Sequence, residues 1–153
     1  MKRFVSVLIL ATIFALAISG CKVKNETYTS SFTMYVNHNL NMEASSSIPS
    51  TDISASQSMA ETYIAIVKSY TVMEQVIEQE NLSMTAQQLI EKVTGTQVGD
   101  SNIVKFSVTT EDPALSKRIA EAIATIAPEA IERIVEGTSV KIVDRPRLPT
   151  RPD

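Results

Sequence analysis

The fold is decided by residues 103–134, which read IVKFSVTTEDPALSKRIAEAIATIAPEAIERI. At the start of this stretch Val104, Phe106 and Val108 alternate with polar neighbours. A period of two predicts a strand with one face buried and the other exposed. We therefore expect a strand from Ile103 to Thr109, with the two valines and the phenylalanine facing the core.

A helix is predicted directly after this strand. Asp112 is suited to accept a hydrogen bond from a free amide of the first turn, and Pro113 fits that turn because its fixed φ is helical. Apolar residues then recur every three or four positions, as the buried side of a helix requires: Leu115, Ile119, Ile123, Ile126, Ala130 and Ile134. Pro128 removes one amide in mid-helix, which predicts a kink or a break, and Gly137 is placed past the end.

Two elements are expected ahead of this unit. From Tyr28 to Val36 the residues alternate again, which predicts a second strand. Residues 37–56 are rich in Asn, Ser and Thr, which favours a loop. One long helix of about 39 Å is then predicted from Ser54 to Gln79, with Glu61, Lys68 and Glu74 on its solvated face. Its apolar stripe is Met59, Tyr63, Ile66, Tyr70, Met73 and Ile77.

The remaining elements are shorter. Thr85 and Gln88 have the spacing of a capping box, which predicts a short helix that Gly95 is placed to end. A last strand is expected from Val140 to Val143. Residues 145–153 carry a proline at every third position, which favours an extended, polyproline-like arm.

The order strand, long helix, short helix, strand, helix, strand predicts an α/β (α+β) fold. We expect one small mixed sheet, with the long helix, the short helix and the C-terminal helix packed on one face. Composition agrees with one globular domain, since apolar residues make up 44% and charged residues 20% of the 153 residues. A net charge of −3 without a dense basic run argues against nucleic acid as a partner.

The first 24 residues have the features of an export signal or a membrane anchor. Lys2 and Arg3 precede an apolar run from Phe4 to Ile18 of about 15 residues, short of the roughly 20 that cross a bilayer as a helix. Ile18-Ser19-Gly20-Cys21 resembles the lipobox of bacterial lipoproteins, in which the cysteine carries the lipid. The alternative is a tilted or slightly short transmembrane helix, and both alternatives place residues 25–144 outside the cytoplasm.

Catalytic machinery is not apparent in the sequence. Cys21 is the single cysteine and His38 the single histidine, so an internal disulfide, a thiolate cluster and a two-histidine metal site are excluded. We expect His38 to lie in a solvated loop, and Glu74 and Glu78 on a solvated helix face. The sequence therefore predicts no enzyme, no cofactor and no catalytic or metal site, with Cys21 as the candidate lipidation site.

Residues 28–152 resemble a known family along nearly the whole exported part. Four stretches are similar to the Wzz-type chain-length determinants, or polysaccharide co-polymerases. They are the strand that begins at Tyr28, the helix with Tyr63 to Met73, the strand and Asp112-Pro113 helix quoted above, and the closing Val140 to Asp144 with its spaced prolines. The Gram-positive branch of this family modulates a capsule tyrosine kinase. The short apolar run and the lipobox depart from the family's usual first membrane helix.

This resemblance implies a function without bond chemistry. The chain would be a regulator of capsule, exopolysaccharide or O-antigen chain length at the bacterial cell membrane, with its domain on the extracytoplasmic side. The implied partners are further copies of the chain, a polysaccharide polymerase or export machinery, the membrane, and a cytoplasmic tyrosine kinase. It also implies a second membrane helix after the arm of residues 145–153. The alternative is an envelope lipoprotein that serves as a binding or adaptor subunit.

Overall fold

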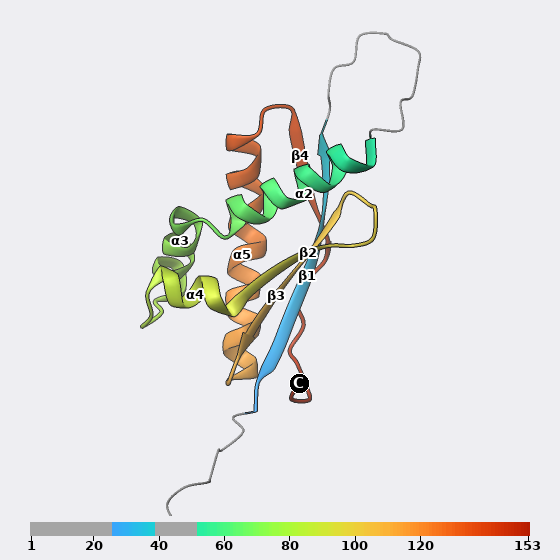
Figure 1. Cartoon of the computed structure of the whole chain (residues 1–153). Helices are drawn as coiled ribbons and strands as arrows, with labels where there is room; N and C mark the ends of the chain where they lie inside the picture. The colour runs from blue at the N-terminus through green and yellow to red at the C-terminus, as the bar shows by residue number, and fades with distance from the viewer. Residues whose placement is uncertain (1–25, 39–51) are drawn as a thin grey trace, which may run out of the picture.

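The structure is a computed structural model that describes residues 26–38 and 52–153, with side chains in the first helix described from Met59 onward. Three helices follow the first strand, and the last helix lies between two strands (Figure 1). In order they are β1 (Tyr28–His38), α2 (Asp52–Val67), α3 (Tyr70–Glu80), α4 (Ala86–Lys92), β2 (Val93–Gln97), β3 (Ile103–Thr110), α5 (Pro113–Ile134) and β4 (Thr138–Asp144).

The four strands form one sheet in the order β2-β3-β1-β4, with helices on one side of it (Figure 1). The α/β class is confirmed, but every pair of neighbouring strands is antiparallel, so the expectation of a mixed sheet is wrong. The reason is the place of β1. The crossover through α5 makes β3 and β4 parallel to each other, and β1 lies between them in the opposite direction.

The alternation of β1 and β3 decides which face of the sheet is buried. Phe32 and Met34 from β1 and Phe106 from β3 are almost fully buried. The rings of Phe32 and Phe106 stack with their centroids 5.5 Å apart. Both predicted strands are confirmed and slightly longer than expected. His38, expected in a loop, is the last residue of β1 and pairs with Thr138 of β4.

Helix α5 packs across the centre of the sheet. Its predicted start is confirmed, since Asp112 Oδ1 accepts a hydrogen bond from the Ala114 amide at 2.8 Å and Pro113 is the first helical residue. The helix continues through Pro128 without a break. Ile134 is 58% exposed and so does not extend the buried stripe, because the helix ends there, and Gly137 follows with a positive φ of 72°.

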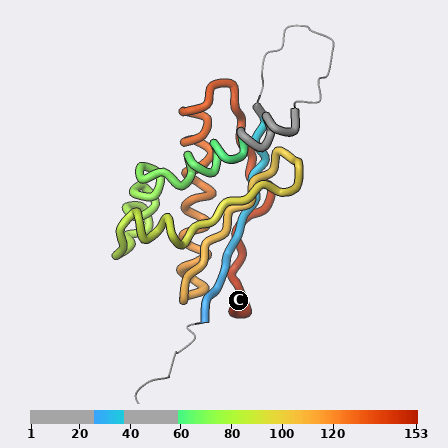
Figure 2. Tube along the Cα trace, in the orientation of Figure 1, coloured from blue at the N-terminus to red at the C-terminus, as the bar shows by residue number. Residues whose placement is uncertain are grey.

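The prediction of one long helix from Ser54 to Gln79 is wrong. The chain turns after Val67 (Figure 2). Ser69 then caps the new helix α3 by accepting from the Val72 amide at 3.4 Å. The turn lets α3 pack against α5, whereas α2 packs against both β2 and α5. The turn also changes which residues face the core, because α3 buries Val72, Met73 and Val76. Tyr70, predicted in the apolar stripe, is therefore 57% exposed. Lys68 lies half-buried in the turn and not on an outer helix face.

Strand β2 was missed in the sequence. Helix α4 starts with the predicted capping box, in which Thr85 Oγ1 accepts from the Gln88 amide and Gln88 Oε1 accepts from the Thr85 amide. The chain then enters β2 at Val93, so Gly95 lies inside a strand and does not end the helix. A Cβ at Gly95 would lie 2.9 Å from two Ile64 carbons and from Phe106 Cε1. Glycine is needed there because α2 approaches β2 closely.

Candidate functional site: an open sheet face and a helical groove

No group of three His, Cys, Asp or Glu residues that could hold a metal occurs within residues 26–38 and 52–153. Glu74 and Glu78 are exposed, as expected. Cys21 and the whole predicted anchor of residues 1–24 lie outside the described residues, so lipidation of Cys21 stays a prediction.

The two ends of the domain lie side by side. After β4, residues 145–153 run along β1 toward its beginning, where the Asp153 amide donates to the Thr27 carbonyl at 2.8 Å. Thr29 Oγ1 donates to Asp153 Oδ2 at 2.7 Å, and Ser30 Oγ donates to the Arg147 carbonyl at 2.8 Å. The extended arm is thus held to the edge of β1, and Figure 1 shows the end of the chain beside the start of this strand. Nowhere in residues 26–38 or 52–153 is a helix both long and apolar enough to cross a membrane.

The start of α5 is held to β1 by a small polar network. Ser116, fully buried, donates through its Oγ to the Tyr28 carbonyl at 2.7 Å and lies 2.7 Å from Thr110 Oγ1. Nearer the other end of α5, burial raises the pKa of the Tyr63 phenol, and its hydrogen bond with Thr138 opposes the shift only in part. Such satisfied buried polar groups favour one arrangement of helix and sheet. These hydrogen bonds therefore help to fix the position of α5 on the sheet.

No helix within the described residues covers the other face of the sheet, which is polar. The residues that alternate with the core positions in β1, β2 and β3 point to it. They are mainly hydroxyl-bearing: Thr29, Ser31, Thr33, Tyr35, Thr94, Thr96, Ser107 and Thr109. We call this surface the open sheet face.

One tyrosine and two lysines occupy neighbouring register positions on the open sheet face. Tyr35, 38% exposed, pairs with Lys141 of β4 on one side and Ile103 of β3 on the other. Lys105 pairs with Thr33 in the neighbouring row. Both lysines are exposed. We call Tyr35, Lys105 and Lys141 the Tyr35 cluster.

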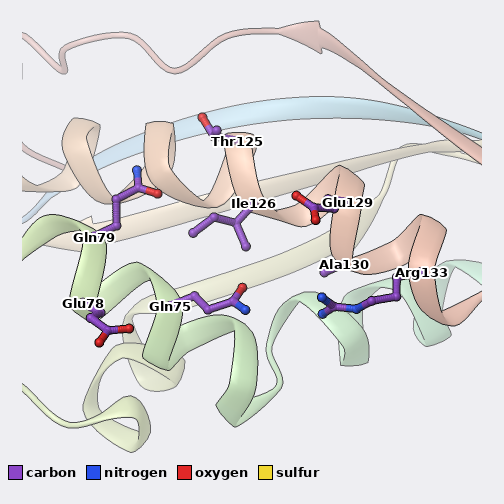
Figure 3. Close-up of a pocket in the computed structure, with 8 residues that line it drawn as sticks. All are labelled: Gln75, Glu78, Gln79, Thr125, Ile126, Glu129, Ala130 and Arg133. Carbon is purple, nitrogen blue, oxygen red and sulfur yellow. The ribbon is translucent and has the colours of Figure 1, made fainter.

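A groove of about 530 Å³ lies between α3 and α5 on the helical side of the molecule (Figure 3). Helix α3 contributes Gln75, Glu78 and Gln79, and α5 contributes Thr125, Ile126, Glu129, Ala130 and Arg133. Ile126 and Ala130 give the groove a small apolar floor. Figure 3 shows Arg133 at the end of the groove remote from Glu78 and Gln79. We call this feature the α3–α5 groove.

Charge is divided between the two sides of the domain. Helices α3 and α5 together carry six carboxylates and three cations. Two of these cations are already paired, Lys117 with Glu121 at 3.2 Å and Arg118 with Glu80 at 3.1 Å. The open sheet face carries two lysines and two carboxylates: Asp144 accepts from the Thr33 hydroxyl at 2.6 Å, and Asp153 accepts from the Thr29 hydroxyl at 2.7 Å. The helical side is therefore the more acidic of the two.

Neither surface was predicted from the sequence. The polar half of the β1 alternation was visible in the sequence, and it is the signal that could have indicated an open sheet face. The α3–α5 groove could not have been found, because the predicted single long helix had no turn at Ser69.

The described residues define an antiparallel α/β domain whose two ends lie together and whose two broad sides differ in charge. The family described as "Chain length determinant protein" (Wzz) matches residues 1–80, more than half of the 153 residues. The chain therefore belongs to the Wzz chain length determinant family, which confirms the resemblance found in the sequence.

Three relatives carry related descriptions. The chain is 29% identical over 126 residues to the capsular polysaccharide biosynthesis protein CpsC of Streptococcus agalactiae, covering 82% of this chain and 54% of that protein. It is 31% identical over 101 residues to the probable capsular polysaccharide biosynthesis protein YwqC of Bacillus subtilis, covering 66% and 41%. It is 30% identical over 154 residues to CpsC of Streptococcus pneumoniae, covering 99% and 66%. The chain thus spans about half the length of the first two of these relatives.

Proposed function

We propose that this protein regulates the chain length of an extracytoplasmic polysaccharide, as a membrane-anchored domain that acts through contacts and not through catalysis. The observation that carries the proposal is its membership of the Wzz family. The three relatives are named as capsular polysaccharide biosynthesis proteins, which makes capsule or exopolysaccharide the first polymer to test. Chain length regulators of this family are in general not enzymes.

The geometry of the two chain ends supports anchoring at one membrane. A chain that enters the domain at Thr27 and leaves it at Asp153 does so at one point, because these residues are hydrogen-bonded to each other. An anchor in residues 1–24 and a membrane helix after the arm would therefore enter the same bilayer without distorting the sheet. Arg145, Arg147 and Arg151 lie in the arm that leads to this pole, and Arg151, the nearest to it, would gain about 1 kcal/mol near anionic headgroups.

Tethering at one pole also favours self-association. Anchored copies share a common orientation and a raised local concentration, so that weak contacts between their sides suffice for assembly. Such an assembly beside a polymerase or an export complex would set how long the polymer grows. Modulation of a cytoplasmic tyrosine kinase is a further proposal, which comes from the Gram-positive branch of the family.

The test is deletion of the gene, followed by separation of the surface polysaccharide by size. We expect synthesis to continue with an altered length distribution, and a plasmid copy of the full chain to restore it. Complete loss of polymer on deletion would refute a regulatory role. An unchanged length distribution, together with loss of another envelope complex, would favour the alternative of a lipoprotein adaptor.

A further inference from the structure

We propose that a groove between β1 and the C-terminal arm binds a sugar unit that carries a carboxylate. The groove has a volume of about 350 Å³, within the range of small-molecule sites. It is lined by Thr29 and Ser31 of β1, by Asp144 at the end of β4, and by Arg145, Arg147 and Leu148 of the arm. We call it the β1–arm groove. The inference rests on the proposed function, because it names the class of polymer that the regulator would contact.

Strand β1 presents backbone groups to this groove. Strand β4 pairs with β1 only from Thr33 to His38, so the first half of β1 has no neighbouring strand on that side. The Val36 amide donates to the Asn102 carbonyl at 2.9 Å, on the side of β3. Backbone groups of successive residues alternate between the two sides of a strand in such a sheet. Those of Thr29 and Ser31 therefore point toward the arm.

The arm does not pair with these backbone groups. Its prolines remove the amide at every third position, 146, 149 and 152. Within residues 26–38 and 52–153, one backbone–backbone hydrogen bond joins the arm to the rest of the chain, from the Asp153 amide to the Thr27 carbonyl. The amides and carbonyls of Thr29 and Ser31 are thus available to the hydroxyl groups of a sugar.

The arm is nevertheless held in position. The Ser30 hydroxyl donates to the Arg147 carbonyl at 2.8 Å, and the Asp144 amide donates to Thr33 Oγ1 at 3.1 Å. Pro146, between these two contacts, is buried. The second wall of the groove is therefore formed before a ligand binds, which lowers the cost of binding.

The charged groups of the groove favour an anionic ligand. Asp144 is held by the Thr33 hydroxyl, and Asp153, just beyond the groove, is held by the Thr29 hydroxyl. Arg145 and Arg147 are exposed, and neither forms an ion pair within the part of the chain that the structure describes. A guanidinium group binds a carboxylate through two parallel hydrogen bonds. The two arginines can therefore select a sugar acid over a neutral sugar.

The apolar part of the groove suits a sugar ring better than a peptide. Leu148 is 54% exposed and Pro149 also lines the groove, so both can pack against the C–H groups of a ring. A peptide that adds to a sheet needs a long free edge. Here the arm continues beside β1 as far as Thr27, which leaves room for a short polar ligand only.

The place of the groove also agrees with a polymer that is made at a membrane. Thr29 and Ser31 follow Thr27 by two and four residues, which puts them roughly 7 and 13 Å from the pole where the chain ends meet. A polysaccharide that leaves the membrane beside this pole would pass the groove.

The first experiment titrates short oligogalacturonate, a chain of sugar acids, into the full chain held in phosphatidylcholine nanodiscs. Isothermal titration calorimetry should show saturable binding, and no binding of a malto-oligosaccharide of equal length, its neutral counterpart. Arg147→Gln should weaken the binding by about tenfold, since it removes a charge-assisted contact. The matched control is Arg151→Gln, which removes the same charge from the arm outside the groove and should change the affinity by less than about twofold.

Four results would overturn the proposal. They are no binding of oligogalacturonate, equal binding of the neutral sugar, an equal loss in both arginine variants, and loss of the binding in nanodiscs that contain phosphatidylglycerol. The third result would assign the binding to the net charge of the arm. The fourth would assign the arginines to lipid headgroups.

The second experiment locates the ligand without any substitution. Hydrogen exchange of the full chain, followed by mass spectrometry, should show that oligogalacturonate slows exchange in residues 28–32 by about fivefold or more. Strand β2 is the control, because it forms the other edge of the sheet and its exchange should not change. Equal slowing in both strands, or binding without slowing in residues 28–32, would place the ligand elsewhere and refute the site.

Failure of this inference is distinguishable from failure of the proposed function. If deletion of the gene alters polymer length but the groove binds no sugar acid, the function stands and the site is wrong. If the groove binds oligogalacturonate but deletion leaves polymer length unchanged, the site stands and the function is wrong.

Discussion

Substitution of Gly95 by alanine tests the close approach of α2 to the sheet. The new Cβ would lie 2.9 Å from Ile64 Cγ1, Ile64 Cγ2 and Phe106 Cε1, a distance that real Cβ contacts do not show. Since Gly95 has no positive φ, the backbone itself accepts alanine. Overpacking of this kind costs about 1–3 kcal/mol, and the loss of unfolded-state entropy returns about 0.4–1 kcal/mol. We expect a net loss of about 1–2 kcal/mol in the free energy of unfolding.

Urea unfolding of residues 25–153, followed by circular dichroism, measures this change. With an m value of about 2 kcal/mol/M the midpoint should fall by about 0.5–1 M at constant m. The matched partner is Ile64→Ala, which removes both of the Ile64 atoms that the new Cβ would meet. The double variant should be more stable than the sum of the two single changes predicts, with a coupling of about 1 kcal/mol. A Gly95→Ala domain as stable as the wild type would refute the argument, and strict additivity would assign the clash to Phe106 alone.

Three further predictions concern the buried polar groups and the anchor. Ser116→Ala should lower the free energy of unfolding by about 1–3 kcal/mol, because it leaves the part-buried Tyr28 carbonyl without its hydroxyl donor; Ser139→Ala, at an exposed position of β4, is the control, and equal urea midpoints would contradict the prediction. Because the pKa of Tyr63 is raised in the folded state, the folded domain retains this proton longer than the unfolded chain does, so stability falls as pH rises through about 10. Tyr63→Phe should flatten that alkaline decline in urea midpoints measured from pH 8 to 11, and an unchanged slope would argue against it. Cys21 should be the lipidated first residue of the mature chain, which intact mass spectrometry of the membrane-extracted protein will decide; a chain that starts at Met1 would show that the apolar run stays as an uncleaved anchor.

Local patterns in the sequence were sufficient for the elements whose signals lie within a few residues. The alternation around Phe32 and Phe106 predicted β1 and β3, and Asp112-Pro113 and the Thr85–Gln88 pair predicted the starts of α5 and α4. These signals are local for two reasons. Successive side chains of a strand point to opposite faces, and the free amides at the start of a helix are capped by residues next to them in the chain. The same stretches carried the resemblance to the Wzz family.

Tertiary packing decided the features on which the open sheet face and the α3–α5 groove depend. The stripe from Met59 to Ile77 is continuous in sequence, yet the chain turns at Ser69, since only a turn brings α3 against α5. Glycine is the residue type that commonly ends a helix, yet Gly95 lies in β2. Glycine occurs there because Ile64 and Phe106, which come from elsewhere in the chain, leave no room for a side chain. The open sheet face and the α3–α5 groove arise in the same way. Each combines residues far apart in sequence, and its position is set by burial of apolar surface and not by local conformational preference.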